Sequence, residues 1–195
     1  GRVVLRADSA VVLLELRSTD TGDDVAKGEA AGEATDPWRV GLRAVTGIVE
    51  HLIPTRVPNV EARFSDRPPA AVARFLLGEQ SYRRASFSSA FAHLSAAYDE
   101  EPTFPLSENR GSQAASWEHD VGAAGRLIDA ALLLDLTPRD RQFTEGIRAY
   151  LDGDAGTAIA ALEGALAQDS LMGVAWAQLG EVYRHLVPTE WPAAD

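Results

Sequence analysis

The chain has 195 residues, of which 46% are hydrophobic and 24% charged, and it contains no cysteine. This composition is ordinary for a globular protein, and the lack of cysteine excludes disulfides, thiolate metal sites and a cysteine nucleophile. The formal net charge is −11, whereas a phosphate-binding surface needs clustered lysine and arginine, so we expect no nucleic-acid partner.

The first part of the chain, residues 1–53, is predicted to be a small α/β module of order β-β-β-α. Val3–Leu5 and Val11–Leu16 are rich in valine and leucine and read as strands. A cluster of turn formers follows, and Asp23–Glu33 then reads as a more polar return strand. No run of 18 apolar residues occurs here or later, so we expect this segment not to insert into a membrane.

A helix is predicted after the third strand. Asp36 suits the N-cap and Pro37 the first helical position, while Pro54 is expected to end the helix. Residues 54–68 then read as a linker. A β-β-β-α piece is small for an independent domain, so we expect the start of this module to be missing. The apolar residues at spacings of three and four form one predicted stripe, namely Leu42, Val45, Ile48, Val49 and Leu52.

From residue 69 to 195, an internal period of 34 residues predicts an array of helices. Small residues let paired antiparallel helices approach closely, and a larger apolar residue fills the space between them. Such residues recur at equivalent places: Gly78, Ala90, Leu94, Ala97 and Pro102; then Ala124, Ile128 and Ala131; then Gly146, Ala158, Leu162 and Ala165; and finally Trp176, Gly180 and Tyr183.

These residues resemble the tetratricopeptide repeat (TPR), which implies a mostly α fold, a helical-hairpin solenoid of about 3.5 repeats following the small α/β module. The repeats are assigned to 71–104, 105–138 and 139–172, with only a first helix in 173–187. The pattern is weakest in the second repeat, where Ser112 replaces the glycine. A solenoid that ends on a lone helix exposes an apolar face, so we expect a truncation at the C-terminus as well.

The segment 75–84 resembles the opening repeat of a group of bacterial multidomain signalling proteins. In these, an N-terminal serine/threonine kinase, or sometimes a cyclase or DNA-binding domain, precedes a TolB-like α/β module and TPRs. Residues 1–53 fit the end of that module. This chain has no kinase motif, so the resemblance implies that any kinase or cyclase activity lies in a missing segment. We expect no catalysis and no cofactor here, and a cytoplasmic location or, behind a membrane-anchored kinase, an extracytoplasmic one.

The resemblance also implies a groove lined by the first helix of each repeat, in which a protein or peptide binds. Residues 69–195 hold nine basic and eighteen acidic side chains, which favours a basic or apolar peptide. The aromatic residues could instead pack between repeats or against residues 1–53, and the array could be a structural spacer between domains. The predicted groove residues are Phe75, Glu79, Tyr82, Arg83, Gln113, Trp117, Phe143, Tyr150, Glu181 and Arg184, with Val72, Ile147 and His185 beside them.

An aspartic hydrolase is a remote third hypothesis. Asp20-Thr21-Gly22 matches the aspartic-protease triplet, in which two carboxylates share a proton. A single copy would require a homodimer, whereas Asp and Gly are also typical of a hairpin turn, which is the interpretation we favour.

Metal sites are not expected. Asp152, Asp154 and Glu163 have part of the spacing of a calcium loop, but Gly156 and Thr157 occupy places that need a ligand and a glycine. The segment 118–120, Glu-His-Asp, reads as a polar helix end. We therefore predict turns between helices at both places.

Overall fold

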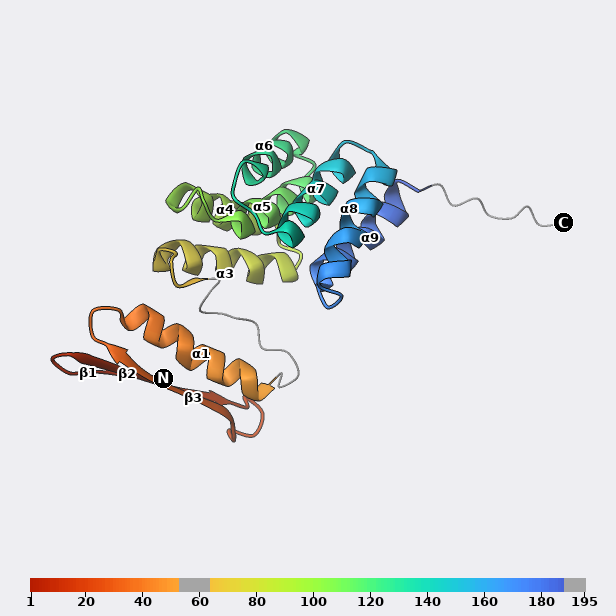
Figure 1. Cartoon of the computed structure of the whole chain (residues 1–195). Coiled ribbons are helices and arrows are strands. Elements are labelled where there is room, and N and C mark those ends of the chain that lie inside the picture. The colour runs from red at the N-terminus through yellow and green to blue at the C-terminus, as the bar shows by residue number, and fades with distance from the viewer. Residues whose placement is uncertain (53–63, 188–195) are drawn as a thin grey trace. The chain divides into compact units, whose positions relative to one another are not determined.

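The computed structural model describes residues 1–52 and 64–187 (Figure 1). The chain divides into two compact units, Gly1–Pro69 and Ala70–Asp195, which are taken one at a time below. The predicted helix stop at Pro54, and all but the last five residues of the expected linker, lie outside the described residues. Within the described residues, no helix has the length and apolar character needed to cross a membrane.

The first unit holds an antiparallel sheet of strand order β1-β2-β3. The turn between the second and third strands contains the Asp20-Thr21-Gly22 triplet. There Gly22 has φ of 76° and donates its N–H to Ser18 O at 2.9 Å. The predicted hairpin turn is therefore present. The strands are β1 (Arg2–Leu5), β2 (Ser9–Arg17) and β3 (Asp24–Glu33).

One helix, α1 (Pro37–Leu52), lies along a face of this sheet (Figure 1). Asp36 caps it as predicted, because Oδ1 accepts the Arg39 N–H at 3.0 Å. The helix approaches β3 closely: a Cβ on Gly28 would lie 1.9 Å from Ala44 O. Glycine on the strand is therefore what allows helix and sheet to pack this tightly.

The side of α1 that packs on the sheet differs from the predicted stripe. Val40 and Ala44 join Ala10 and Val12 of β2 in the core. Val45 and Leu52, which were assigned to the buried stripe, are 37% and 47% exposed. The prediction is right at Leu42, which is buried, and at Ile48, which lies against Gly28 of β3, and it is wrong at Val45 and Leu52.

The second unit consists of successive helices, with two helices in or within two residues of each of the ranges 71–104, 105–138 and 139–172, and one in 173–187. Side chains cap three of the N-termini, since Asp120, Thr137 and Asp154 accept N–H groups from the first turn. The helices are α3 (Pro69–Arg83), α4 (Phe87–Glu100), α5 (Pro105–Trp117), α6 (Val121–Leu132), α7 (Pro138–Leu151), α8 (Ala155–Gln168) and α9 (Gly173–His185).

In the first and the third helix pair, the two helices approach closely at a glycine on one helix and a leucine on the other, a contact here called the seam of the pair. A Cβ on Gly78 would lie 2.5 Å from Leu94 Cγ, and a Cβ on Gly146 would lie 2.6 Å from Leu162 Cγ. Both leucines are 0% exposed. Two seams that are 68 residues apart thus have the same sterics, which makes the unit a solenoid of TPR-type helical hairpins.

The fourth glycine position departs from this pattern. The expectation of an equivalent tight seam fails at Gly180, where an added Cβ would meet nothing within 4 Å. Trp176 and Tyr183, on the same helix, are 55% and 46% exposed. Their spacing places all three on one face of α9, and no second helix covers that face among the described residues.

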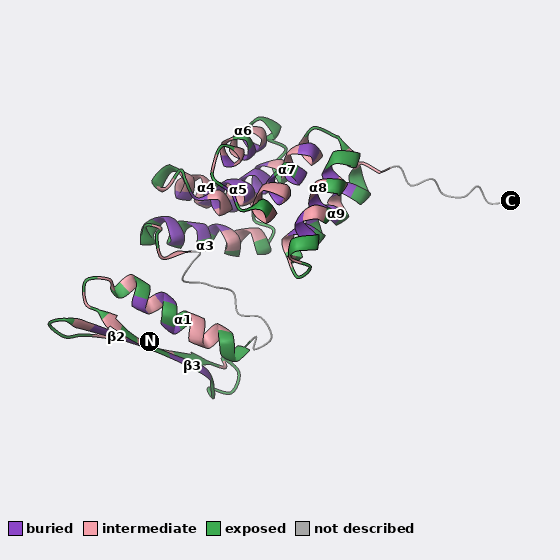
Figure 2. Cartoon of the chain, viewed as in Figure 1, coloured by how far each residue is buried: buried purple, intermediate pink, exposed green. Residues whose placement is uncertain are grey.

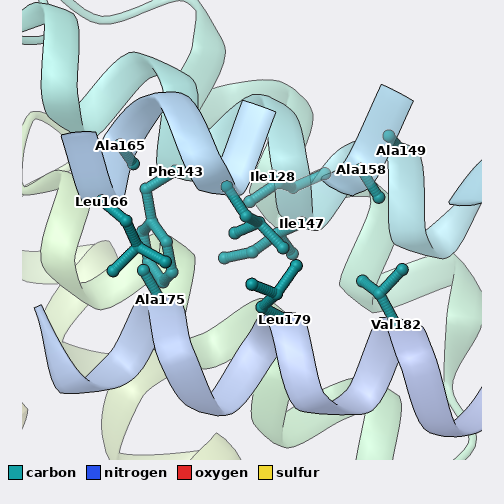
Figure 3. Close-up of a cluster of buried hydrophobic side chains, with 11 residues drawn as sticks. Ile128, Phe143, Ile147, Ala149, Ala158, Ala165, Leu166, Ala175, Leu179 and Val182 are labelled. Carbon is teal, nitrogen blue, oxygen red and sulfur yellow. The ribbon is translucent and has the colours of Figure 1, made fainter. Parts of the chain in front are cut away.

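The opposite face of α9 closes the core of the array. Ala175, Leu179 and Val182 are buried and lie toward side chains of α7 and α8 (Figure 3). Phe143 and Ile147 of α7 form the centre of that cluster. Burial is concentrated on the helix faces that meet within the array, and the outer faces are exposed (Figure 2).

Candidate functional site

The helices α5, α7 and α9, which are the first helices of successive repeats, surround one cavity of about 300 Å³, here called the central cavity. Counted from the first residue of each repeat, the ninth and thirteenth residues of repeats two, three and four all line this cavity. Its lining is Ser112, Gln113, Ser116, Trp117, His119, Val121, Ile147, Tyr150, Leu151, Gln178, Glu181 and His185.

A pair of amides forms one wall of the central cavity. Gln113 of α5 donates from Nε2 to Gln178 Oε1 of α9 at 2.9 Å, and both side chains are buried. Arg110 Nη1 donates to Gln113 Oε1 at 2.7 Å, and Arg110 Nε also bonds to Glu79 of α3. These hydrogen bonds link polar side chains of the first helices of repeats one, two and four, with Arg110 and Gln113 joined within α5.

An aromatic cluster lies at the other end of this polar chain. Trp117 stacks on Phe87 with ring centroids 5.3 Å apart, and its Nε1 donates to Tyr82 OH at 2.9 Å. The Arg110 guanidinium lies over the Tyr82 ring, 4.5 Å from its centroid. These contacts hold Trp117 in place while leaving it 43% exposed at the rim of the cavity.

The acidic wall is formed by α9. His185 Nε2 lies 3.0 Å from Glu181 Oε2 and forms an ion pair with it when the imidazole is protonated, and that oxygen has no hydrogen bond among the described residues. Burial of the Tyr150 phenol, followed by the charge of Glu181, raises the pKa of Tyr150 above its usual value of 10.0. Ser112 is fully buried, and its Oγ also has no hydrogen bond in the described part of the chain.

The predicted groove residues fall into three groups. Gln113, Trp117, Tyr150 and Glu181 line the central cavity, as do Ile147 and His185. Glu79 and Tyr82 lie next to it, in the contacts with Arg110 and Trp117. The remaining residues, which the structure places elsewhere, are Val72, Phe75, Arg83, Phe143 and Arg184.

Two of those placements correct the prediction of an accessible aromatic groove. Phe75 and Phe143 are only 7% and 6% exposed, and Phe75 packs on Phe104 with centroids 5.1 Å apart. Both are the fifth residue of their repeats, and both are buried in the core of the array. Arg83 and Arg184 are exposed, but neither lines the cavity.

Arg110 and Gln178 were not predicted, although the sequence holds a signal for them. Both occupy the sixth place of a repeat, together with Thr144. Thr144 is also buried and bonds to Asn109 at 3.0 Å. A polar residue at the sixth place of three successive repeats indicates a polar layer along the first helices, which the repeat register alone could have revealed.

The other candidate chemistries correspond to turns and caps. Asp154 accepts the Thr157 N–H at 3.0 Å and its hydroxyl at 2.7 Å, so it caps α8. Asp120 caps α6 in the same way. Among residues 1–52 and 64–187, no group of three or more potential metal ligands comes together. Asp20 lies in the exposed turn described above.

Comparison with known proteins gives no family model that matches the chain and no match among curated proteins. Two TPR domains are among the solved structures that are similar to it. The first TPR of Spaghetti (RPAP3), bound to the HSP90 peptide SRMEEVD, is 14% identical, with a TM-score of 0.47 over 61% of this chain and 97% of that one. The Sgt2 TPR domain from Aspergillus fumigatus is 18% identical, with a TM-score of 0.48 over 66% of this chain and 89% of that one.

Proposed function

We propose that this chain binds an extended segment of a partner protein in the central cavity, and that it serves as a protein-binding scaffold or sensor segment without a catalytic step. The observation that carries the proposal is the cavity itself. Three successive first helices supply its walls from equivalent places, and its volume of about 300 Å³ accommodates a peptide side chain.

The lining has the composition of a binding surface. Trp117 and Tyr150 are aromatic side chains that can be buried at little cost in conformational entropy, and they are typical anchors of protein interfaces. Gln113 and Gln178 place amide groups within reach of a peptide backbone, which offers both donors and acceptors. The excess of acidic side chains in residues 69–195 favours a partner segment without net negative charge.

Selection from a random peptide library, displayed on phage, tests this proposal. We expect the chain to enrich a defined sequence motif, and we expect Trp117→Ala and Tyr150→Ala each to weaken binding of the selected peptide by about tenfold or more. Tyr183→Ala is the matched control, because Tyr183 is an exposed aromatic residue of α9 outside the cavity. Binding that survives both cavity variants, or that is lost only in the control, contradicts the proposal.

A structural spacer is the second candidate, and the uncovered face of α9 favours it. Trp176, Gly180 and Tyr183 present two aromatic rings beside a small residue, which fits a helix packed as in the other hairpins. This function requires further repeats after Asp195 that carry the binding surface. A full-length protein whose added repeats bind the partner while residues 69–195 do not would establish it.

The signalling context is a further part of the proposal. A three-stranded antiparallel sheet with one helix precedes the array, in the order expected for the end of a TolB-like module before TPRs. We therefore expect the gene to encode a serine/threonine kinase or cyclase domain upstream of Gly1. Sequencing of the full gene checks this, and a different upstream domain contradicts the context without affecting the binding cavity.

A further inference from the structure

We propose that the central cavity receives a single cationic side chain, an arginine or a lysine, from the bound segment. This inference rests on the proposed function and names the chemistry that the site selects. Among the described residues, Glu181 is the only carboxylate in the lining, and none of the lining residues is a lysine or an arginine. His119 and His185 also line the cavity, so when both imidazoles are neutral the lining carries one negative charge in a partly desolvated site.

Two acceptor oxygens in the lining have no hydrogen bond among the described residues, although His185 Nε2 lies 3.0 Å from one of them, Glu181 Oε2. Glu181 Oε2 is shielded from solvent, although 30% of the side chain as a whole is exposed, and Ser112 Oγ is fully buried. A buried carboxylate oxygen without a donor is unfavourable, and an ammonium or guanidinium group supplies the missing hydrogen bonds together with the opposite charge. An apolar side chain in the same place would leave both oxygens without a hydrogen bond.

The aromatic walls suit a cation as well. Trp117 and Tyr150 both line the cavity, and the faces of such rings attract ammonium and guanidinium groups. The chain already contains one such pair, because the Arg110 guanidinium lies 4.5 Å from the centroid of the Tyr82 ring. That arginine is bonded to Glu79 and Gln113, so it does not neutralise Glu181.

Four synthetic peptides test the proposal with the intact chain. Each is acetyl-Ala-Ala-X-Ala-Ala-amide, where X is arginine, lysine, citrulline or norleucine. Binding is followed by NMR titration of the backbone amides. Citrulline keeps the shape of arginine and removes its charge, and norleucine does the same for lysine. We expect the two cationic peptides to bind about tenfold more tightly than their neutral counterparts, with shifts concentrated on α5, α7 and α9.

Variants of the chain make the test specific. Glu181→Gln should remove the preference for the charged peptides, and Ser112→Ala should weaken it, while circular dichroism verifies that each variant folds. Glu145→Gln is the matched control, since Glu145 is an exposed carboxylate of α7 outside the cavity. A preference for arginine over citrulline that persists in Glu181→Gln overturns the proposal.

The remaining outcomes separate this inference from the proposed function. Equal binding of arginine and citrulline, or tighter binding of norleucine, overturns the cationic pocket and leaves the peptide-binding cavity intact. If none of the four peptides shifts the amide signals, the cationic pocket is also overturned. The proposed function itself fails only when library selection yields no peptide that depends on Trp117 and Tyr150.

Discussion

Replacing Gly146 by alanine tests the repeat architecture at its narrowest point. The new methyl group would lie 2.6 Å from Leu162 Cγ and 3.5 Å from Ala158 O, and Leu162 is completely buried. Overpacking of this kind costs about 1–3 kcal/mol, and the gain in helix propensity from glycine to alanine offsets about 0.5–1 kcal/mol of it. We therefore expect Gly146→Ala to lower the free energy of unfolding by about 1 kcal/mol, within a range of about 0–2.5 kcal/mol.

A double-mutant cycle isolates the seam from other effects. On a Leu162→Ala background the clash is gone, so Gly146→Ala should become stabilising by about 0.5–1 kcal/mol, the helix-propensity term alone. Gly180→Ala is the matched control, because its methyl group meets no atom within 4 Å and it too should stabilise the chain. Urea unfolding followed by circular dichroism gives all five stabilities. If Gly146→Ala stabilises the wild-type chain as much as Gly180→Ala does, the tight seam is refuted.

Two further predictions concern titrating groups. Glu181→Gln removes one of the two causes that raise the pKa of Tyr150, so that pKa should fall toward 10.0 without reaching it, because burial remains. Ultraviolet titration of the phenolates measures this, Tyr150→Phe assigns the transition, and an unchanged pKa contradicts the placement of Glu181. Hydrogen bonds from Thr157 hold the pKa of Asp154 below 3.8. The ionised cap therefore stabilises the fold above pH 3.8, and this stabilisation is lost as the pH falls through the lowered pKa of Asp154. Urea unfolding of Asp154→Ala against the wild-type chain should thus show a difference at neutral pH that disappears in acid, and a difference that persists there contradicts this account of the cap.

The repeat register could be read from the sequence because backbone proximity leaves little choice of residue at the seams. Where two helices touch at Gly78 or Gly146, any side chain would meet a buried leucine, so the same small residue recurs at a fixed period. The same reasoning located Asp36 as a capping residue, since it precedes a proline at the first helical position. Both features depend on local backbone geometry, so residues that are close together in the sequence are enough to predict them.

The candidate site was only partly predictable because side-chain direction within a helix decides what reaches the cavity. Gln113, Trp117 and Glu181, at the ninth or thirteenth residue of their repeats, were predicted to face a groove, and they line the cavity. The fifth place gave Phe75 and Phe143, which are buried in the core, since an aromatic side chain next to a seam packs inward when space allows. The hydrogen bond between Gln113 and Gln178 joins residues of different repeats, so its partner could not be identified without the structure.

In the first unit, the length of the elements was predictable but the packing face of α1 was not. Apolar periodicity favoured a stripe that included Val45 and Leu52, both of which are partly exposed. The sheet contacts Val40 and Ala44 in addition to Ile48 of the stripe, because Gly28 on β3 lets the helix backbone come close. Glycine and alanine contribute little to a hydrophobic pattern, so a search for large apolar residues does not identify a helix face that packs through small ones.

Site-specific photo-crosslinking tests the central claim, that the cavity between α5, α7 and α9 is the peptide-binding site. A benzophenone amino acid is placed at Ser116, which lines the cavity, and separately at Tyr183, which lies outside it. The library-selected peptide is then irradiated with each protein and the adducts are mapped by mass spectrometry. We predict an adduct from position 116 and none from position 183. Crosslinking from position 183 alone would place the peptide on the outer face of α9 and contradict the account.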